Sequence, residues 1–159
     1  MKKATLTLLA LGAVSSASAA NYVGGSIGSG LSVHYQSDLT TTSAIRYGLN
    51  LDAVNFNFNA LSVNASVDYL ADFAAAGGSL GGFTPYYGVG LGAGAGLGAN
   101  LGLSVYPHAT LGLRYNISAP LSVFVEGNAG PYIRVGSGAN TTSIGFGSTA
   151  RVGLNYRLP

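Results

Sequence analysis

The residues of this chain that could do acid–base or nucleophilic chemistry are few and scattered. His34 and His108 are possible bases, and Ser32, beside His34, is a possible nucleophile. A hydrolytic site needs a nucleophile, a base and an orienting acid that converge, and the sequence shows no assembled set. The two histidines also lack acidic neighbours at metal-ligand spacing. We therefore expect a protein that is not an enzyme, with no catalytic residues, no metal site and no cofactor, in which His34 donates a hydrogen bond.

The charged residues carry more information because of where they fall. From Thr149 to Leu158, Arg151 and Arg157 lie on one side of a two-residue alternation, and Val152, Leu154 and Tyr156 lie on the other. Successive side chains of a strand point to opposite faces, so this segment has one apolar face and one charged face. The same alternation places seven further charges on a polar face: Arg46, Asp52, Asp68, Asp72, Arg114, Glu126 and Arg134. Asp38 is the exception, in a polar segment that we read as a loop.

Alternation alone does not say which face is inside. A secreted soluble β-sandwich would turn its charges outward, whereas a membrane barrel would turn them inward. Lys2 and Lys3 precede an apolar run, and Ala17 to Ala19 are small, so residues 1–20 are typical of a secretory signal peptide and residues 21–159 of the domain that follows. The run is too short to span a membrane as a helix.

The composition of the processed chain favours lipid outside. Of seven basic residues, two are the leader lysines, which leaves five arginines against five acidic residues and a net charge of zero. Nucleic-acid binding thereby loses its support. A soluble surface usually carries many more charges, lysines included. No apolar run of about 20 residues follows the leader, so spanning requires a closed barrel.

These observations predict an all-β fold, an eight-stranded antiparallel up-and-down transmembrane β-barrel in the bacterial outer membrane. The alternation slips between Leu51 and Val54 and again between Phe58 and Leu61, and each slip indicates a turn or a bulge. Reading the first slip as a bulge gives seven strands, and reading both as turns gives eight, the even number that bacterial barrels have. The expected strands are 22–35, 43–51, 54–60, 61–72, 85–97, 103–115, 121–135 and 143–158.

Three segments resemble small opacity-like and OmpX/OmpW/OmpA-type outer-membrane barrels. Residues 84–94 (TPYYGVGLGAG) resemble a PYxGxGxG segment, residues 111–126 (LGLRYNISAPLSVFVE) a strand, turn and strand, and residues 152–158 (VGLNYRL) a terminal strand. The resemblance implies a periplasmic N-terminus and extracellular loops near 36–42, 59–61, 98–102 and 136–142. It also implies that Tyr156 and Leu158 belong to the signal for the barrel-assembly machinery, although such chains usually end in an aromatic residue.

The lumen of such a barrel would hold the charges. Buried charges survive only when they are paired, so the near balance of signs favours ion pairs that brace the barrel over a path for solutes. One strand carries a run of lumen glycines that leaves space: Gly88, Gly90, Gly92, Gly94 and Gly96. That space either accommodates bulky side chains opposite or forms a groove for a small ligand.

The expected function is that of an integral outer-membrane barrel with a structural role and a salt-bridged lumen. A narrow pore or transporter for small hydrophilic or amphiphilic solutes is the alternative, and surface recognition or a lipid-modifying activity is less favoured. The expected partners are outer-membrane lipid and the assembly machinery, with no nucleic acid, and the protein is expected to be a monomer. Outward tyrosines would anchor the membrane interfaces, namely Tyr22, Tyr35, Tyr47, Tyr115 and Tyr156.

Overall fold

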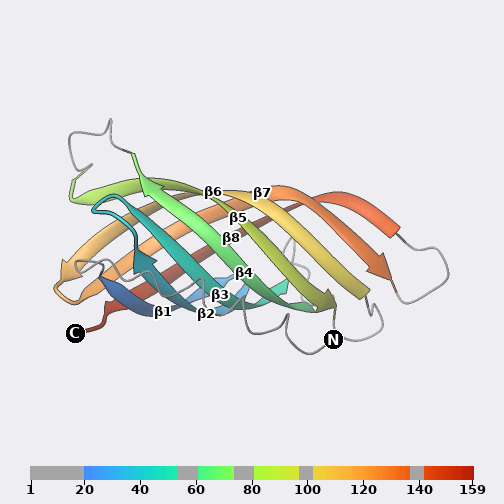
Figure 1. Cartoon of the computed structure of the whole chain (residues 1–159), viewed down its shortest axis with the longest axis horizontal. Helices are drawn as coiled ribbons and strands as arrows, with labels where there is room; N and C mark the ends of the chain where they lie inside the picture. Colours follow the sequence, from blue (N-terminus) through green and yellow to red (C-terminus); the bar gives the residue numbers. More distant parts are fainter. Residues whose placement is uncertain (1–19, 54–60, 74–80, 97–101, 137–141) are drawn as a thin grey trace, which may run out of the picture.

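The computed structural model describes residues 20–53, 61–73, 81–96, 102–136 and 142–159. These residues form a closed barrel of eight strands in which each strand pairs with its neighbours in the sequence and β1 pairs with β8, as Figure 1 shows. All the pairings are antiparallel. The strands are β1 (Asn21–Gly28), β2 (Gly30–Asp38), β3 (Ser43–Ala53), β4 (Leu61–Asp72), β5 (Phe83–Gly96), β6 (Gly102–Ser118), β7 (Leu121–Gly136) and β8 (Thr142–Arg157). The described residues include no helix that is long and apolar enough to cross a bilayer.

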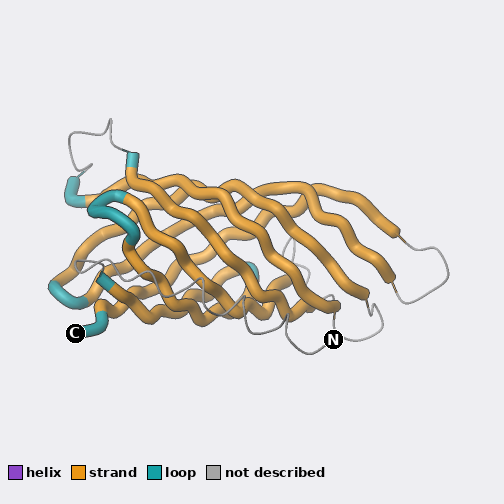
Figure 2. The backbone as a smooth tube through the Cα atoms, viewed as in Figure 1, coloured by secondary structure: helices purple, strands orange, loops and turns teal. Residues whose placement is uncertain are grey.

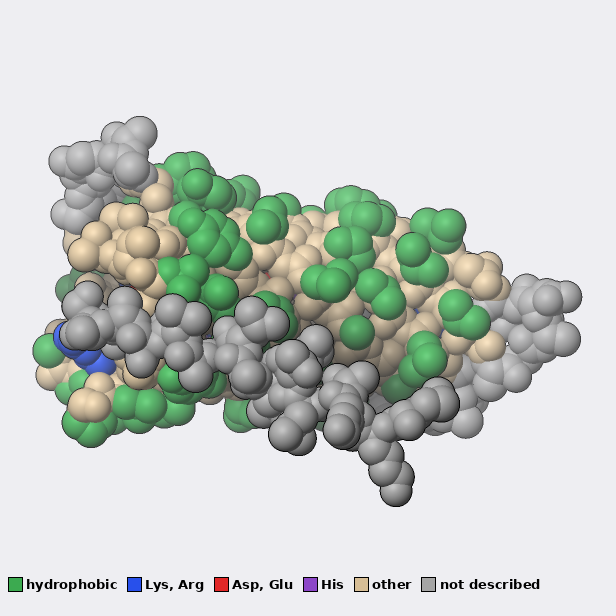
Figure 3. Space-filling view, in the orientation of Figure 1, with side chains coloured by type: hydrophobic (Ala, Val, Ile, Leu, Met, Phe, Trp, Pro, Cys, Tyr) green, Lys and Arg blue, Asp and Glu red, His purple; other side chains and the backbone are tan. Residues whose placement is uncertain are grey.

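The two faces of the wall differ as the alternation predicts. Outward side chains are mostly apolar and exposed, and Figure 3 shows them along the length of the visible face. Inward side chains are mostly polar and buried. Even-numbered residues face the lumen in β1 to β7 and odd-numbered residues do so in β8, because Val135 pairs with Thr142 across the last turn. The eight-stranded count is confirmed, and Arg46, Asp68 and Glu126 are buried on the inward face.

The expected single strand 22–35 is wrong, because it is two strands joined by a tight turn. Ile27 pairs with Leu31, so both partners are odd-numbered and the inward and outward positions continue unchanged through the turn. Periodicity therefore could not show this turn. A side chain at Gly28 would overlap the carbonyl group of Ala150, and glycine lets the chain pass there.

The expected strand 54–60 lies outside the described residues. β3 pairs directly with β4, from Ser43 opposite Ala71 to Ala53 opposite Leu61, and the closed barrel already has eight strands. β2, the second strand of the β1–β2 hairpin, therefore brings the number of strands to eight, a number for which a strand at 54–60 was expected.

Because residues 22–35 form two strands and not one, the segment 36–42 lies at the other end of the barrel from the one expected. The backbone N–H of Asp38 donates to Ala20 and that of Leu158 donates to Asn21. The β2–β3 turn therefore lies where the described part of the chain starts and finishes, which we call the end that holds the termini. Figure 2 shows it among the described turns gathered at that end. Asp38 is the last residue of β2 and not part of a loop.

The strands differ in length. β1 and β2 have 8 and 9 residues, whereas β6, β7 and β8 have 17, 16 and 16. The end that holds the termini is level, so the opposite end rises from the β1–β2 hairpin to the tips of β7 and β8 (Figure 1).

Candidate functional site

The centre of the lumen is occupied by a cluster around Glu126 on β7. Both terminal nitrogens of Arg46 donate to its Oε2 at 2.9 Å, and the hydroxyl of Tyr86 donates to the same oxygen at 2.6 Å. Arg151 donates to Oε1. The Glu126 side chain is 0% exposed. The guanidinium carbon of Arg46 also lies 5.4 Å from the ring centroid of Phe124, within cation–π range.

A second group of polar residues continues the cluster across the barrel. Arg151 donates to Asn50 at 3.2 Å, and Asn50 donates to Ser66 at 3.2 Å. Ser66 donates to Asp68 at 3.4 Å, and Nε2 of His108 lies 2.7 Å from the other oxygen of Asp68. We call these two groups together the lumen network: Arg46, Asn50, Ser66, Asp68, Tyr86, His108, Glu126 and Arg151. It draws side chains from β3 to β8, so polar contacts link six of the eight strands.

The remaining expected lumen charges lie elsewhere. Arg114 pairs with Asp72 at 2.9 Å at the end that holds the termini. Arg134 lies on the lumen face of β7 near the opposite end, and Arg157 is exposed at the end of β8; neither makes an ion pair with a described side chain. Asp52 occupies the position of β3 opposite Ser62, and its side chain lies outside the described part.

The lumen glycines of β5 adjoin bulky neighbours. A Cβ at Gly88 would overlap Leu70, one at Gly90 would overlap Asp68 and His108, and one at Gly94 would overlap Asn64. Gly92 differs, because the nearest atoms to its Cβ position lie 3.7 Å away. Gly96 ends the strand and faces inward. These contacts favour the reading in which glycines make room for large side chains, whereas a Cβ at Gly92 would make ordinary van der Waals contacts.

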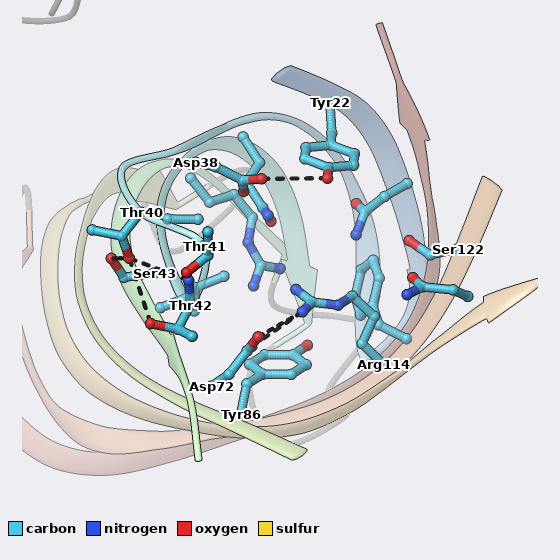
Figure 4. A pocket seen from close by; sticks show the side chains of 17 residues that line it. Tyr22, Asp38, Thr40, Thr41, Thr42, Ser43, Asp72, Tyr86, Arg114 and Ser122 are labelled. Carbon is cyan, nitrogen blue, oxygen red and sulfur yellow. Dashed lines mark hydrogen bonds and ion pairs between the residues drawn. The ribbon is translucent and has the colours of Figure 1, made fainter. Parts of the chain in front are cut away.

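A polar cavity of about 130 Å³ lies inside the barrel at the end that holds the termini (Figure 4). Its rim includes the β2–β3 turn from Thr40 to Ser43 and the Arg114–Asp72 pair. Tyr22, expected to face outward, lines this cavity and donates to Asp38 at 3.3 Å, because its even number places it on the lumen face. Arg46, Tyr86 and Phe124 also line it, so the cavity adjoins the lumen network.

The residues considered for catalysis do not converge. Ser32 shares a hydrogen bond of 2.6 Å with Ser26, and His34 shares one of 2.6 Å with Asn155. His108 contacts Asp68 instead, with no serine or threonine at its other nitrogen, which faces the carbonyl of Tyr106 at 3.1 Å. Within the described ranges, no three acidic, histidine or cysteine side chains gather as a metal site would require.

The sequence did not predict several residues that contact Glu126 or its arginine partners. Tyr86, Asn50 and Phe124 complete the surroundings of Glu126, and nothing in their local sequence marks them. The contact between Asp68 and His108 did leave a signal, because Gly90 stands between them in the cross-strand register and leaves room for the two side chains to meet. This glycine can be interpreted only when the pairing of β4 with β5 and of β5 with β6 is known, and the periodicity within one strand does not give that pairing.

No protein-family model and no curated protein sequence matches the chain. Among solved structures, Neisserial surface protein A is similar, with a TM-score of 0.50 and 12% identity over 88% of this chain and 94% of that one. The chain has the fold of a small outer-membrane β-barrel. A major outer membrane protein from Thermus thermophilus has a TM-score of 0.48 and 14% identity, over 89% of this chain and 100% of that one. The N-terminal β-barrel domain of Pseudomonas aeruginosa OprF has a TM-score of 0.47 and 15% identity, over 88% and 96%.

Proposed function

We propose that this protein is an integral barrel of the bacterial outer membrane whose lumen is braced and closed by its own charges. The apolar outward face supports a lipid environment, and exposed outward tyrosines such as Tyr35, Tyr47, Tyr115 and Tyr156 are suited to the membrane interfaces. Outer-membrane lipid is then its main partner. Its role is structural, and the monomer is the functional unit.

The observation that carries this proposal is the satisfied carboxylate of Glu126. It accepts from two arginines and a tyrosine that reach it from three other strands. A water-filled pore would keep such groups hydrated, whereas here the side chains hydrogen-bond one another and the carboxylate has no exposed surface. We infer that a network of this kind holds the strands together and closes the lumen at its level.

Conductance tests the closed lumen. The purified barrel in planar lipid bilayers should insert without discrete current steps, and Glu126→Gln should introduce transient steps because it releases Arg46 and Arg151. Reproducible steps from the unaltered protein would reject the closed barrel.

A narrow pore is the second candidate, favoured by the polar cavity beside the termini. This cavity would be the periplasmic vestibule of a path that Arg46 and Arg151 gate. If the unaltered barrel conducts, Arg151→Gln should change its ion selectivity, since it removes one cation from the narrowest section. A conductance unaffected by that change would place the path elsewhere.

Export supplies a separate test. We infer that residues 1–20 are a signal peptide that is removed on export. We also infer that Tyr156 and Leu158 belong to the signal that the assembly machinery recognises. Intact-mass measurement of the protein from the outer-membrane fraction should give a chain that starts at Ala20 or Asn21. Recovery of the full-length mass from that fraction would contradict cleavage.

A further inference from the structure

The wall of the barrel is incomplete on one side. β1 pairs with β8 only from Tyr22 opposite Arg157 to Gly28 opposite Arg151, and the N–H of Ser29 then donates to Ala150. β8 continues for eight more residues to Thr142 while pairing with β7. In the described part of the chain, no strand pairs with the other edge of β8 from Thr142 to Gly147. Figure 2 shows the small turn between β1 and β2 part-way along the barrel.

Strand lengths place this gap relative to the membrane. With the usual rise and tilt, the 8 residues of β1 climb about 20 Å along the barrel axis and the 16 residues of β8 climb about 40 Å. The apolar band of an outer-membrane barrel is about 25 Å tall. Both strands start at the level end beside the termini. The hairpin therefore ends within the bilayer, on the side opposite the termini.

The outer face of the tall side stays apolar to its tips. Leu103 on β6 is 70% exposed, and Ile144 and Phe146 on β8 are 76% and 67% exposed. Such side chains are suited to lipid and poorly suited to water. The part of the gap just above the hairpin therefore faces the leaflet opposite the termini, where an unpaired strand edge is costly.

The inner face behind the gap carries Arg134, a cation for which the described side chains supply no counter-charge. Arg134 makes no ion pair with a described side chain, and its Nε is buried without a hydrogen-bond partner. Four of the five acidic residues in the sequence lie towards the other end and have partners there: Asp38, Asp68, Asp72 and Glu126. Arg134 thus has no neutralising contact among the described side chains, unlike Arg46, Arg114 and Arg151, and the side chain of the fifth acidic residue, Asp52, lies outside the described part.

Aromatic and glycine residues shape the same face. Tyr132 lies over Gly145 of β8, where a Cβ would be 2.5 Å from the phenol oxygen. Tyr106 crosses to β8 and donates to the carbonyl of Gly147 at 3.1 Å, and its ring stacks on His108 at 4.9 Å between centroids. The lumen network closes the space from below. We call this inner face beside the gap, which carries Tyr106, Tyr132, Arg134 and Gly145, the half-shell.

We propose that this half-shell binds one anionic membrane lipid, whose phosphate contacts Arg134 and whose acyl chains leave through the gap above the β1–β2 hairpin. A guanidinium binds phosphate oxygens in a bidentate manner, and the phosphate and ester oxygens of the lipid are acceptors for unpaired N–H groups on the β8 edge. The lipid satisfies both groups at once. This inference rests on the proposed membrane location.

A second copy of the chain fits the edge poorly. In two copies inserted with the same orientation, both β8 strands run towards the end that holds the termini, so they cannot pair antiparallel. Because the strands of facing barrels tilt in opposite directions, the two edges would also cross and not lie side by side. A lipid needs no such alignment.

Native mass spectrometry of the detergent-solubilised barrel provides the test. Phosphatidylglycerol and phosphatidylcholine with the same acyl chains are titrated in parallel, and the unaltered barrel should retain one phosphatidylglycerol in preference. Arg134→Gln should weaken that binding about tenfold, the effect of losing one charge-assisted contact. Arg134→Lys should preserve most of it.

Arg157→Gln is the matched control, because it removes the same charge at the opposite end and should leave the affinity unchanged. Gly92→Leu places a bulky side chain on the lumen face opposite Tyr106 and should reduce lipid retention while the cation stays in place. Arg134 has no described ion-pair partner, so its replacement should leave the fold intact, which far-ultraviolet circular dichroism verifies.

Equal retention of the two lipids, equal losses in Arg134→Gln and Arg157→Gln, or a dimer mass in place of the lipid adduct would overturn the proposal. Displacement of the lipid by millimolar inorganic phosphate would likewise overturn it in favour of a soluble anion. Any of these results in a correctly inserted barrel would leave the membrane location standing, so the two proposals fail separately.

Discussion

At the scale of single residues, Glu126 has the greatest consequence for stability. Its carboxylate neutralises Arg46 and Arg151 together, so Glu126→Gln leaves two guanidinium groups in the lumen without a counter-charge. We expect the free energy of unfolding to fall by about 3–5 kcal/mol, as when one partner of a buried pair is removed. Urea unfolding of the barrel in lipid vesicles, followed by circular dichroism, measures it.

Arg157→Gln serves as the reference for that measurement. Arg157 is exposed and makes no ion pair within the described residues, so its loss should change stability by less than about 0.5 kcal/mol. Equal effects of the two substitutions would mean that Glu126 does not hold the lumen network together.

The alternation within each strand predicted which face most of the charged residues occupy, but it did not predict which charges form ion pairs. Arg46 and Glu126 are 80 residues apart and meet across the barrel, and that contact depends on the register of all the strands between them. Alternation within a strand carries no information on register between distant strands. For the same reason Tyr86 and Asn50 could not be assigned to the network in advance.

At the scale of the strand, β5 offers two glycines with opposite tolerances. Gly90→Ala should destabilise the barrel by about 1–3 kcal/mol, because its methyl group would overlap Asp68 and His108. Gly92→Ala, one inward position further along the same strand, should have little effect, since its Cβ meets nothing closer than 3.7 Å. Urea midpoints of the two variants make the comparison, and equal midpoints would contradict it.

The strands themselves were predictable wherever a turn was marked by a change of alternation or by turn residues. The turn at Ala119–Pro120 and the borders of β6 and β7 follow the expected ranges closely. The β1–β2 hairpin was missed because its turn keeps the alternation in step, and only Gly28 and Gly30 hinted at it. Strand number was therefore correct while strand division was not.

At the scale of the whole molecule, the outward face determines whether the barrel inserts. Leu49 lies midway along β3 and is exposed to the lipid side. Leu49→Arg should make folding into vesicles less favourable by about 2–4 kcal/mol, the cost of a cation near the middle of the bilayer. Thr41→Arg, in the exposed β2–β3 turn, adds the same charge outside the membrane and should cost little. A similar cost for both would argue against a membrane-spanning wall.

The inward placement of the arginines also affects how the folded protein meets proteases. Residues 21–159 contain no lysine, and every bond among them that a trypsin-like enzyme could cut follows one of five arginines. Arg46, Arg114, Arg134 and Arg151 lie within paired strands with their side chains inside the lumen, and only Arg157 is exposed. Such an enzyme would remove no more than the last two residues of the assembled barrel, whereas a chain that fails to assemble would be cut throughout its length.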